Sequence, residues 1–345
     1  MSNNNLVQNR PATMQDVANA SGVSLSSVSK ILSGATNFKA ETIKKVENAA
    51  ALLHYTPNAM ARSIASNTSN RIIGYLVPNL FNSYYADMVT YLEKYLHQHN
   101  YELTVCLFHD DATRVANYLK FLTQIRAAGV IFGSFHEPAC QKDIDLAREY
   151  MSIVSIQGDV NNVDRVDVTD YDGTYEMISY LIKKGHRKIG FLGYQYEVQV
   201  LAARAKAYKD ALADNGIPFN PDYFLDYTQK PDSGYTMANQ LLDLPDPPTA
   251  IHCFNEYIVP GVYNAIYDRG LRIPEDISVT GFDGIHVSEE LRPKLTTVYG
   301  PNDTMAQTAV NMLLSRIEGK SSPVPQHIMF KTSIIERQSV ADLNK

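Results

Sequence analysis

The chain has 345 residues, 45% of them hydrophobic and 20% charged, which is enough apolar material for a core and predicts about two or three domains rather than one. No apolar run approaches the roughly 18 residues that cross a bilayer, and the first residues lack the profile of a secretory signal, so we expect a cytosolic protein without membrane association. The net charge is −6, but residues 1–71 carry seven Lys and Arg against three Asp and Glu, so this basic head on an acidic body predicts an anionic partner for the head.

The first 56 residues combine a polar arm with three short helical patterns. Residues 1–12 are rich in Asn and form the predicted flexible arm. After them, apolar residues recur at helical spacing in three groups: Met14, Val17 and Ala18; Val28, Ile31 and Leu32; and Ile43, Val46, Ala49, Ala50 and Leu53. Three short helices in about 45 residues are typical of a small DNA-binding bundle, which we predict over residues 13–56.

The small and polar residues of this head predict a helix-turn-helix. Thr13 can cap the first helix, Gly22 can adopt the positive φ of the turn, and Ser24 can cap the second helix. With Val28 and Ile31 facing the core, the outward residues of the second helix are Leu25, Ser26, Ser27, Ser29 and Lys30. Short polar side chains at a helix N-terminus suit phosphate oxygens and base edges in a major groove. The alternative is a solvated three-helix domain whose serines only cap its helices.

A linker is predicted to follow the three helical patterns. Pro57 interrupts the helical pattern, and residues 57–70 are predicted to be a linker with a latent helix.

From Arg71 onward, short apolar strands alternate with amphipathic helices. The predicted strands are Ile72–Val77, Leu103–Phe108, Val130–Phe135, Ile153–Ile156, Ile189–Leu192, Tyr223–Asp226, Ala250–Phe254, Ser278–Phe282 and Thr296–Tyr299. Continuous apolar strands alternating with helices indicate parallel sheets covered on both faces, and about nine strands exceed one usual sheet. We therefore predict two doubly wound α/β subdomains with a cleft between them.

Several polar and aromatic residues follow the predicted strands, where ligands collect in parallel sheets. They are Asn82, Tyr84 and Tyr85 after the first strand, His136 after the third, Asn255 and Glu256 after Ala250–Phe254, and Asp283 after Ser278–Phe282. Arg204 lies on a following helix. Aromatic faces, one Arg, one Asn and two carboxylates suit a polyhydroxylated ligand. Alternatively, Arg204 is a surface residue paired with Asp210 or Glu197, and Asp283 caps its turn.

The sequence gives an enzyme little support. It has no phosphate-binding glycine loop, no GxSxG elbow and no HExxH motif. The nine histidines and three cysteines match no metal-ligand or disulfide spacing, so we expect neither a metal nor another cofactor. Glu256 and Asp283 end neighbouring strands and leave a sugar hydrolase as an alternative.

The head and linker resemble the lac repressor (lactose/galactose repressor) family of bacterial transcription factors. The resemblance is carried by the run from Thr13-Met14-Gln15-Asp16-Val17-Ala18 to Ile31-Leu32-Ser33-Gly34, by Glu41-Thr42, and by His54-Tyr55-Thr56-Pro57-Asn58-Ala59-Met60-Ala61-Arg62-Ser63. It implies that the second helix enters the major groove and that Asn58–Ile64 forms a hinge helix in the minor groove, with Ile64 as an apolar wedge. Lys30 stands where the family usually has Arg, and Ile43 replaces another common Arg. The predicted DNA-binding residues are Thr13, Ser24, Leu25, Ser26, Ser27, Ser29, Lys30, Asn37, Asn58, Ala61 and Ile64.

The resemblance continues through the body, in Gly185-His186-Arg187-Lys188-Ile189, Arg272-Ile273-Pro274-Glu275-Asp276, Gly281-Phe282-Asp283 and Pro293-Lys294-Leu295-Thr296-Thr297. It implies a periplasmic-binding-protein-like body with one subdomain over residues 71–168 and 299–328 and the other over residues 169–298 and 329–340. Arg204, Asn255 and Asp283 fall on effector positions of sugar-responsive members. Glu256 and Gln157 stand where Asp is common, and we include both in the predicted effector site.

The function that the resemblance implies is that of a homodimeric repressor. It would bind a near-palindromic operator, control a carbohydrate-utilisation operon and respond to a small sugar or sugar derivative. One alternative is a global carbon-catabolite regulator that uses a phosphoprotein corepressor. Another is a carbohydrate-binding protein whose DNA-binding head is vestigial.

Overall fold

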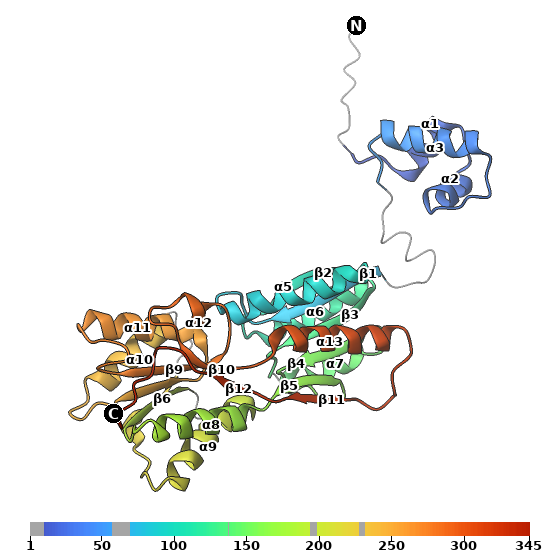
Figure 1. Cartoon of the computed structure of the whole chain (residues 1–345). Helices are drawn as coiled ribbons and strands as arrows, with labels where there is room; N and C mark the ends of the chain where they lie inside the picture. The colour runs from blue at the N-terminus through green and yellow to red at the C-terminus, as the bar shows by residue number, and fades with distance from the viewer. Residues whose placement is uncertain (1–9, 57–69, 137, 194–198, 228–231) are drawn as a thin grey trace. The chain divides into compact units, whose positions relative to one another are not determined.

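The computed structural model of the chain describes residues 10–56, 70–136, 138–193, 199–227 and 232–345. Its contacts divide it into two compact units, residues 1–70 and 71–345, which we call the head and the body (Figure 1). No helix of the described residues has the length and hydropathy needed to span a membrane. The hinge helix predicted for Asn58–Ile64 lies outside the described residues.

The head is a three-helix bundle whose local signals explain its helix boundaries. Helix α1 (Met14–Ser21) begins at a capping box formed by Thr13 and Asp16 and ends at Gly22, which has a φ of 68°. Helix α2 (Leu25–Leu32) is capped by Ser24, and α3 (Ala40–Leu52) closes the bundle. The core of the head consists of Val17, Ala18, Val28, Ile31, Val46, Ala49 and Ala50. The predicted helix-turn-helix is therefore present.

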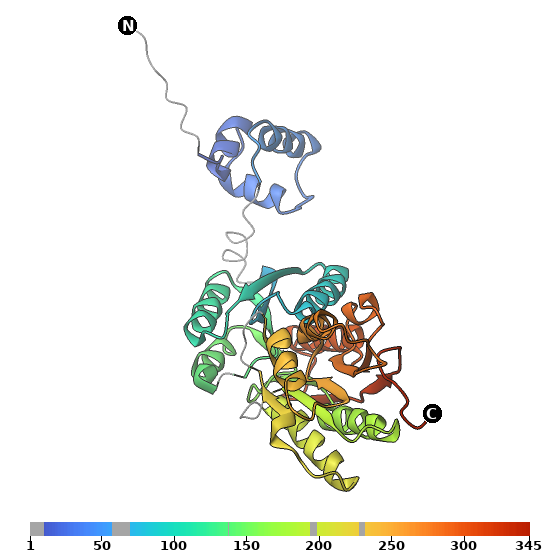
Figure 2. The same ribbon diagram turned by 90° about the vertical axis from the view of Figure 1, so that its left-hand side faces the viewer.

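The first sheet of the body has the strand order β11-β5-β4-β3-β1-β2. Its strands are β1 (Asn70–Val77), β2 (Glu102–Leu107), β3 (Ala127–Gly133), β4 (Ser152–Ile156), β5 (Asp164–Val168) and β11 (His327–Phe330). Helices α5 (Ser83–Gln98) and α13 (Asn302–Ile317) pack on one face. Helices α6 (Ala112–Gln124) and α7 (Gln141–Ala147) pack on the other, as the turned view shows (Figure 2).

The second sheet has the order β12-β10-β9-β8-β6-β7. Its strands are β6 (Ile189–Gly193), β7 (Phe224–Asp226), β8 (Ala250–Cys253), β9 (Ser278–Asp283), β10 (Thr296–Tyr299) and β12 (Ser333–Ile335). The flanking pairs of helices are α8 (Asp170–Lys183) with α9 (Gln199–Asp214), and α10 (Ser233–Leu242) with α11 (Val259–Asp268), while α12 (Val287–Glu290) follows β9 (Figure 1). Short 3₁₀ turns cover Pro138–Cys140, Pro221–Tyr223 and Glu256–Ile258.

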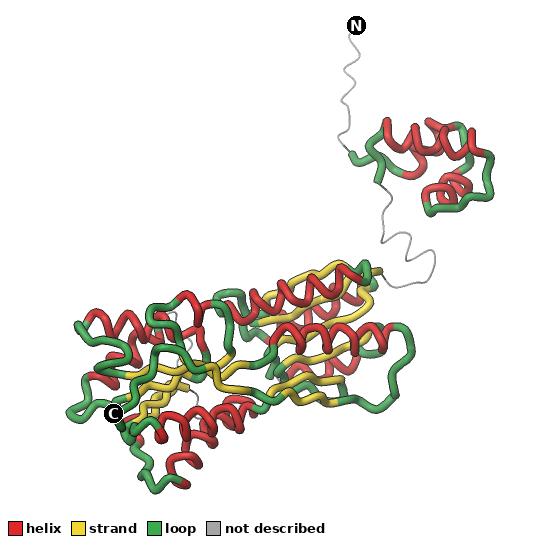
Figure 3. The backbone as a smooth tube through the Cα atoms, viewed as in Figure 1, coloured by secondary structure: helices red, strands yellow, loops and turns green. Residues whose placement is uncertain are grey.

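The chain crosses between the two sheets at three places. The crossovers join β5 to α8, β10 to α13, and β11 to β12 (Figure 3). Two of them are joined to each other by hydrogen bonds, because the Thr169 and Thr332 hydroxyls lie 3.0 Å apart and the Thr332 amide donates to Thr169 Oγ1. The residues beside these crossovers therefore lie at the junction of the two sheets.

The predicted two-sheet architecture is confirmed, but the predicted strands were incomplete. Strands β5, β11 and β12 were not predicted: β5 carries polar residues in alternation, whereas β11 and β12 are short and largely exposed. Strand β12, which was not predicted, pairs with β10 in antiparallel fashion, whereas the other described pairings of both sheets are parallel, as predicted. The strand predicted at Val130–Phe135 is Ala127–Gly133, so His136 lies beyond a loop rather than directly after the strand.

Candidate functional site

The head presents the start of α2 to solvent. Leu25 is 44% exposed although it is apolar, and Ser26 and Lys30 are exposed, while Ser27 and Ser29 are half-buried. The Ser24 hydroxyl lies 2.9 Å from that of Ser27 and caps the first turn. Thr13 and Asn37 are also exposed. A helix N-terminus with small hydroxyl side chains and one Lys can contact phosphates and base edges.

The centre of the body site is an ion pair between Arg204 and Asp170. Arg204, on α9, is only 4% exposed, and its Nε and Nη2 lie 2.8 and 2.7 Å from Asp170 Oδ1. Asp170 begins α8 directly after a crossover from the first sheet. Arg204 Nη1 donates to the carbonyl oxygen of Phe254, and its guanidinium carbon lies 3.5 Å from the centre of the Phe282 ring. The pairing with Asp210 considered from the sequence was wrong, because Asp170 holds Arg204, and Lys206 and Tyr171 hold Asp210. Glu197, the other partner considered, lies outside the described residues.

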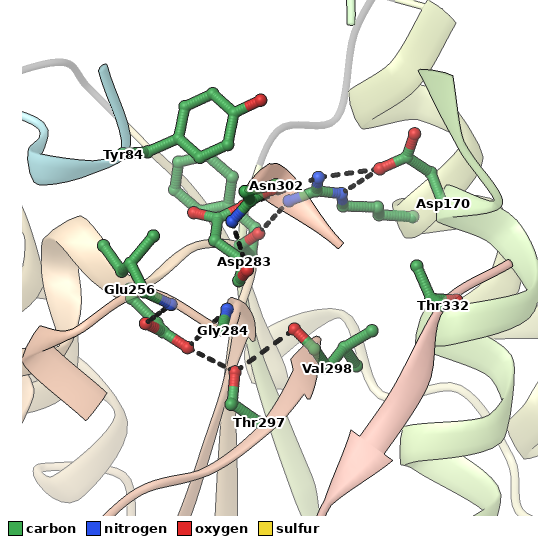
Figure 4. A network of polar contacts seen from close by, with 12 residues as sticks. Tyr84, Asp170, Glu256, Asp283, Gly284, Thr297, Val298, Asn302 and Thr332 are labelled. Atoms are coloured by element: carbon green, nitrogen blue, oxygen red, sulfur yellow. Dashed lines mark hydrogen bonds and ion pairs between the residues drawn. The ribbon is translucent and has the colours of Figure 1, made fainter. Parts of the chain in front are cut away.

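Asp283, at the end of β9, and Tyr84, on α5 of the other subdomain, lie near this ion pair (Figure 4). Asp283 ends β9 with a φ of 115°, and its Oδ1 lies 3.9 Å from Arg204 Nη2. Burial raises the pKa of Asp283 to about 7, although the Arg204 charge opposes that shift. Tyr84, on α5, is buried, and its hydroxyl has no hydrogen-bond partner among the described residues. We call Tyr84, Asp170, Arg204, Asn255 and Asp283 the junction site.

Glu256 has a structural role instead of the predicted ligand role. Its side chain is fully buried, and its two carboxylate oxygens accept the backbone amides of Gly284 and Ile285, each at 2.9 Å. The Thr297 hydroxyl donates to the same carboxylate (Figure 4). Burial, followed by the nearby Asp283 carboxylate, raises the pKa of Glu256 to about 8. Because the carboxylate oxygens of Glu256 accept hydrogen bonds from the loop after β9, we remove Glu256 from the candidate effector residues. The sugar-hydrolase pair that Glu256 would form with Asp283 is removed with it.

Three other predicted residues lie near the same ends of the strands. Asn255 is half-buried, directly follows the Phe254 carbonyl that accepts from Arg204, and its Oδ1 lacks a partner among the described residues. Tyr85 packs edge-on against Tyr84, and burial raises its pKa. The Asn82 side chain instead caps α5 by accepting the amide of Tyr84 at 3.0 Å.

His136 and Gln157 belong to a neighbouring polar region of the first sheet. The pKa of His136 falls to about 4, mainly because of burial, while Asp159 raises it and Arg165 lowers it further. Gln157 follows β4, is buried, and has a φ of 49°. The charges here are internally paired, since Arg165 lies 3.2 Å from Asp159 and 3.0 Å from Asp167. Their part in effector binding stays a prediction.

Sequence reasoning missed Asp170, His252 and Phe282 around the ion pair, and also Tyr75 near Tyr84. Asp170 follows an unpredicted strand, so the strand-end rule did not reach it. Tyr75 lies within β1 and is fully buried with an unpartnered hydroxyl among the described residues. His252 lies within β8, and its pKa falls to about 3 because of burial and then the Arg204 charge. Phe282 was assigned only to a strand, and only the ring contact with Arg204 reveals its role.

Two family models match the chain. The model described as "Bacterial regulatory proteins, lacI family" matches residues 13–58, and "Periplasmic binding protein-like domain" matches residues 178–340. The first match covers the helix-turn-helix. The second covers β6 through β12, which includes the whole second sheet.

The chain is also similar to known proteins over most of its length. It is 31% identical over 337 residues to the HTH-type transcriptional repressor PurR of Haemophilus influenzae (strain PittEE), covering 96% of this chain and 99% of that protein. Its structure resembles the lac repressor dimer bound to operator and the anti-inducer ONPF, with a TM-score of 0.79, 24% identity, and 96% and 100% of the two chains covered. A LacI family transcriptional regulator from Enterococcus faecium with bound ribose has a TM-score of 0.70, 25% identity, and 79% and 99% covered.

Proposed function

The chain belongs to the lacI family of bacterial regulatory proteins and is a DNA-binding transcriptional regulator of repressor type, and we propose that a small sugar bound at the junction site controls its operator affinity. The observation that carries this proposal is the buried Arg204 held between the Asp170 and Asp283 carboxylates. Carboxylates in a low-dielectric site accept hydrogen bonds from ligand hydroxyl groups strongly. The regulator with bound ribose among the similar structures supports the same ligand class.

The proposed mechanism uses the position of the site between the two sheets. Tyr84 lies on α5, a helix that packs on the first sheet, whereas Arg204 lies on α9 beside the second sheet and Asp283 ends β9 of that sheet. A ligand that contacts both sides favours one relative position of the two subdomains, and the crossovers allow the subdomains to move. In a homodimer bound to a near-palindromic operator, that motion changes the spacing of the two heads. The regulated genes would form a carbohydrate-utilisation operon.

Operator binding by the purified full-length protein tests the DNA-binding part. A duplex would be enriched from a random library and titrated by fluorescence anisotropy at several salt concentrations. We expect a palindromic sequence, steep weakening with salt, and about tenfold weaker binding for Lys30→Ala, which is about 1.4 kcal/mol. Lys120→Ala, which removes an exposed lysine of the body, should bind as the wild type does. Enrichment of no palindrome would contradict the proposal.

A panel of mono- and disaccharides added to that complex tests the effector part. One neutral sugar is expected to change operator affinity, while its own affinity stays the same in Lys30→Ala. If operator binding is intact but no sugar alters it, the sugar effector is wrong and a protein corepressor becomes the explanation. If sugar binds and no DNA does, the alternative of a carbohydrate-binding protein with a vestigial head is correct.

A further inference from the structure

The charge of Arg204 is already compensated within the protein. Among the lysines and arginines of the described residues, it alone is buried. Its Nε and Nη2 contact Asp170, its Nη1 donates to the Phe254 carbonyl, and Asp283 lies 3.9 Å from Nη2. The Phe282 ring covers one face of the guanidinium. Every nitrogen of Arg204 therefore has a protein partner before any ligand arrives.

Four buried polar atoms without partners, on Tyr75, Tyr84, Asn255 and His252, are uncharged. Arg165 Nε and Asp167 Oδ1 also lack hydrogen-bond partners among the described residues, but they belong to the paired charges of the first sheet. Among the described residues, the hydroxyls of Tyr75 and Tyr84, Oδ1 of Asn255 and Nε2 of His252 are buried and make no hydrogen bond. Burial raises the pKa of both tyrosines far above neutral pH, and His252 has a pKa of about 3, so all four groups are neutral at pH 8. These atoms can donate to or accept from ligand hydroxyl groups. They offer no positive charge to an anion.

An anionic ligand would therefore enter a site whose described residues offer no free positive charge. Removing a phosphate or carboxylate from water costs several kcal/mol unless a buried cation or several strong donors compensate for it. Here the Arg204 guanidinium is already paired with Asp170. The carboxylate of Asp283 would also repel an anionic ligand above its pKa of about 7. Ligand hydroxyls face no such penalty, because they donate to Asp283 and accept from the tyrosines.

We propose that Asp170 sets the charge selectivity of the junction site: by holding Arg204 in an internal ion pair, it makes the site select an uncharged sugar or polyol over the phosphorylated or carboxylated form of the same compound. This inference rests on the proposed sugar effector and narrows it. Asp170 is a positioning residue, since it acts through Arg204. Its removal is expected to change selectivity between ligands of different charge, which a purely structural role would not do.

Isothermal titration calorimetry of the full-length protein at pH 8 tests the inference. The probes are matched pairs: ribose with ribose 5-phosphate, glucose with glucose 6-phosphate and with gluconate, and fructose with fructose 6-phosphate. For the pair whose neutral member binds, we expect the charged member to bind at least about 100-fold more weakly. In Asp170→Asn, the freed Arg204 charge should shrink that ratio by about tenfold or more.

A matched variant shows whether the change in the ratio of neutral to charged ligand affinity comes from Asp170 itself. Asp172→Asn removes an exposed carboxylate from the same helix and should keep the wild-type ratio. Urea unfolding of each variant verifies that its body is folded.

Three calorimetric results would contradict the selectivity inference, and they differ in what they imply for the proposed sugar effector. If a charged member binds the wild type more tightly than its neutral counterpart, the selectivity inference is wrong while a sugar-derived effector survives. If Asp170→Asn leaves the ratio unchanged, Asp170 does not set it. If no member of either kind binds, both this inference and the sugar effector of the proposed function fail.

Discussion

Glu256 and Asp283 show at the residue scale how position decides the role of a buried carboxyl group. Glu256 accepts two backbone amides and one hydroxyl, so it fixes the loop that follows β9. Asp283 ends the strand beside it and directs its carboxylate toward Arg204. The first residue therefore stabilises the site, and the second is placed to meet a ligand.

Replacing Glu256 with Gln should destabilise the body. The amide NH₂ of Gln would face a backbone N–H or the Thr297 hydroxyl, which leaves a buried polar group without its acceptor and costs about 1–3 kcal/mol. Urea unfolding of the full chain measures this loss. Glu149→Gln, an exposed change of the same kind, should have little effect. An unchanged midpoint in Glu256→Gln would show that these hydrogen bonds contribute nothing.

Asp283 predicts the direction of a pH dependence. Its pKa rises from 3.8 to about 7 on folding, so between these values the folded state holds a proton that the unfolded state has lost. The free energy of unfolding should therefore fall as pH rises from about 4 to about 7, by at most about 1.4 kcal/mol per pH unit from this group. Urea unfolding at pH 5, 6 and 7 should show a shallower fall in Asp283→Asn. Identical slopes in the two proteins would contradict this assignment.

Much of the junction site could be predicted from strand ends, and its main ion pair could not. The rule that ligands collect at the carboxyl ends of parallel strands was enough to select Tyr84, Asn255 and Asp283. Asp170 was missed because it depends on β5, whose alternating polar residues hide a buried strand. Glu256 was predicted as a ligand because a sequence does not reveal which backbone amides a carboxylate will meet.

At the element scale, the head was predictable because its signals are local. The caps at Thr13 and Ser24 and the turn at Gly22 lie within a few residues of the helices they define. Strands β11 and β12 depend instead on pairing with segments far away in sequence, β5 and β10. Short exposed strands carry little hydrophobic pattern of their own, so they could not be predicted.

Thr13→Ala should destabilise α1 without affecting the body. The Thr13 side chain accepts the amide of Asp16 and donates to its carboxylate, so its loss should cost about 1 kcal/mol. Hydrogen exchange by mass spectrometry should show about fivefold faster exchange in α1, with peptides from residues 71–345 unchanged. Thr36→Ala, at an exposed position outside the helices, serves as the control. Equal exchange in both variants would rule out a stabilising cap.

At the scale of the whole body, one side-chain contact links the two subdomains near α12. His286, which follows β9 of the second sheet, lies 2.8 Å from Asp87 on α5 of the first. The hydrogen bond to Asp87 raises the pKa of His286 above its usual value of 6.5. Because the folded pKa is raised, the stabilisation is fully present below pH 6.5 and is lost as pH rises through the folded pKa. This contact should favour the same arrangement of subdomains more strongly in mild acid.

NMR titration of the His286 imidazole tests that contact. The wild-type pKa should lie above 6.5, and Asp87→Asn should return it toward 6.5. Glu93→Gln removes an exposed carboxylate from the same helix and should leave the titration unchanged. The same shift in both variants would mean that the general charge of α5, rather than the Asp87 contact, acts on His286.

The measurement that most directly tests the whole account is operator affinity with and without a saturating neutral sugar, in the wild type and in Asp283→Asn. In the wild type, the sugar should change the operator dissociation constant at least about fivefold, a coupling of about 1 kcal/mol. Asp283→Asn should bind operator as the wild type does without sugar, and should show no change when sugar is added. If a sugar that demonstrably occupies the body leaves wild-type operator affinity unchanged, the junction site does not control the head and the account is wrong.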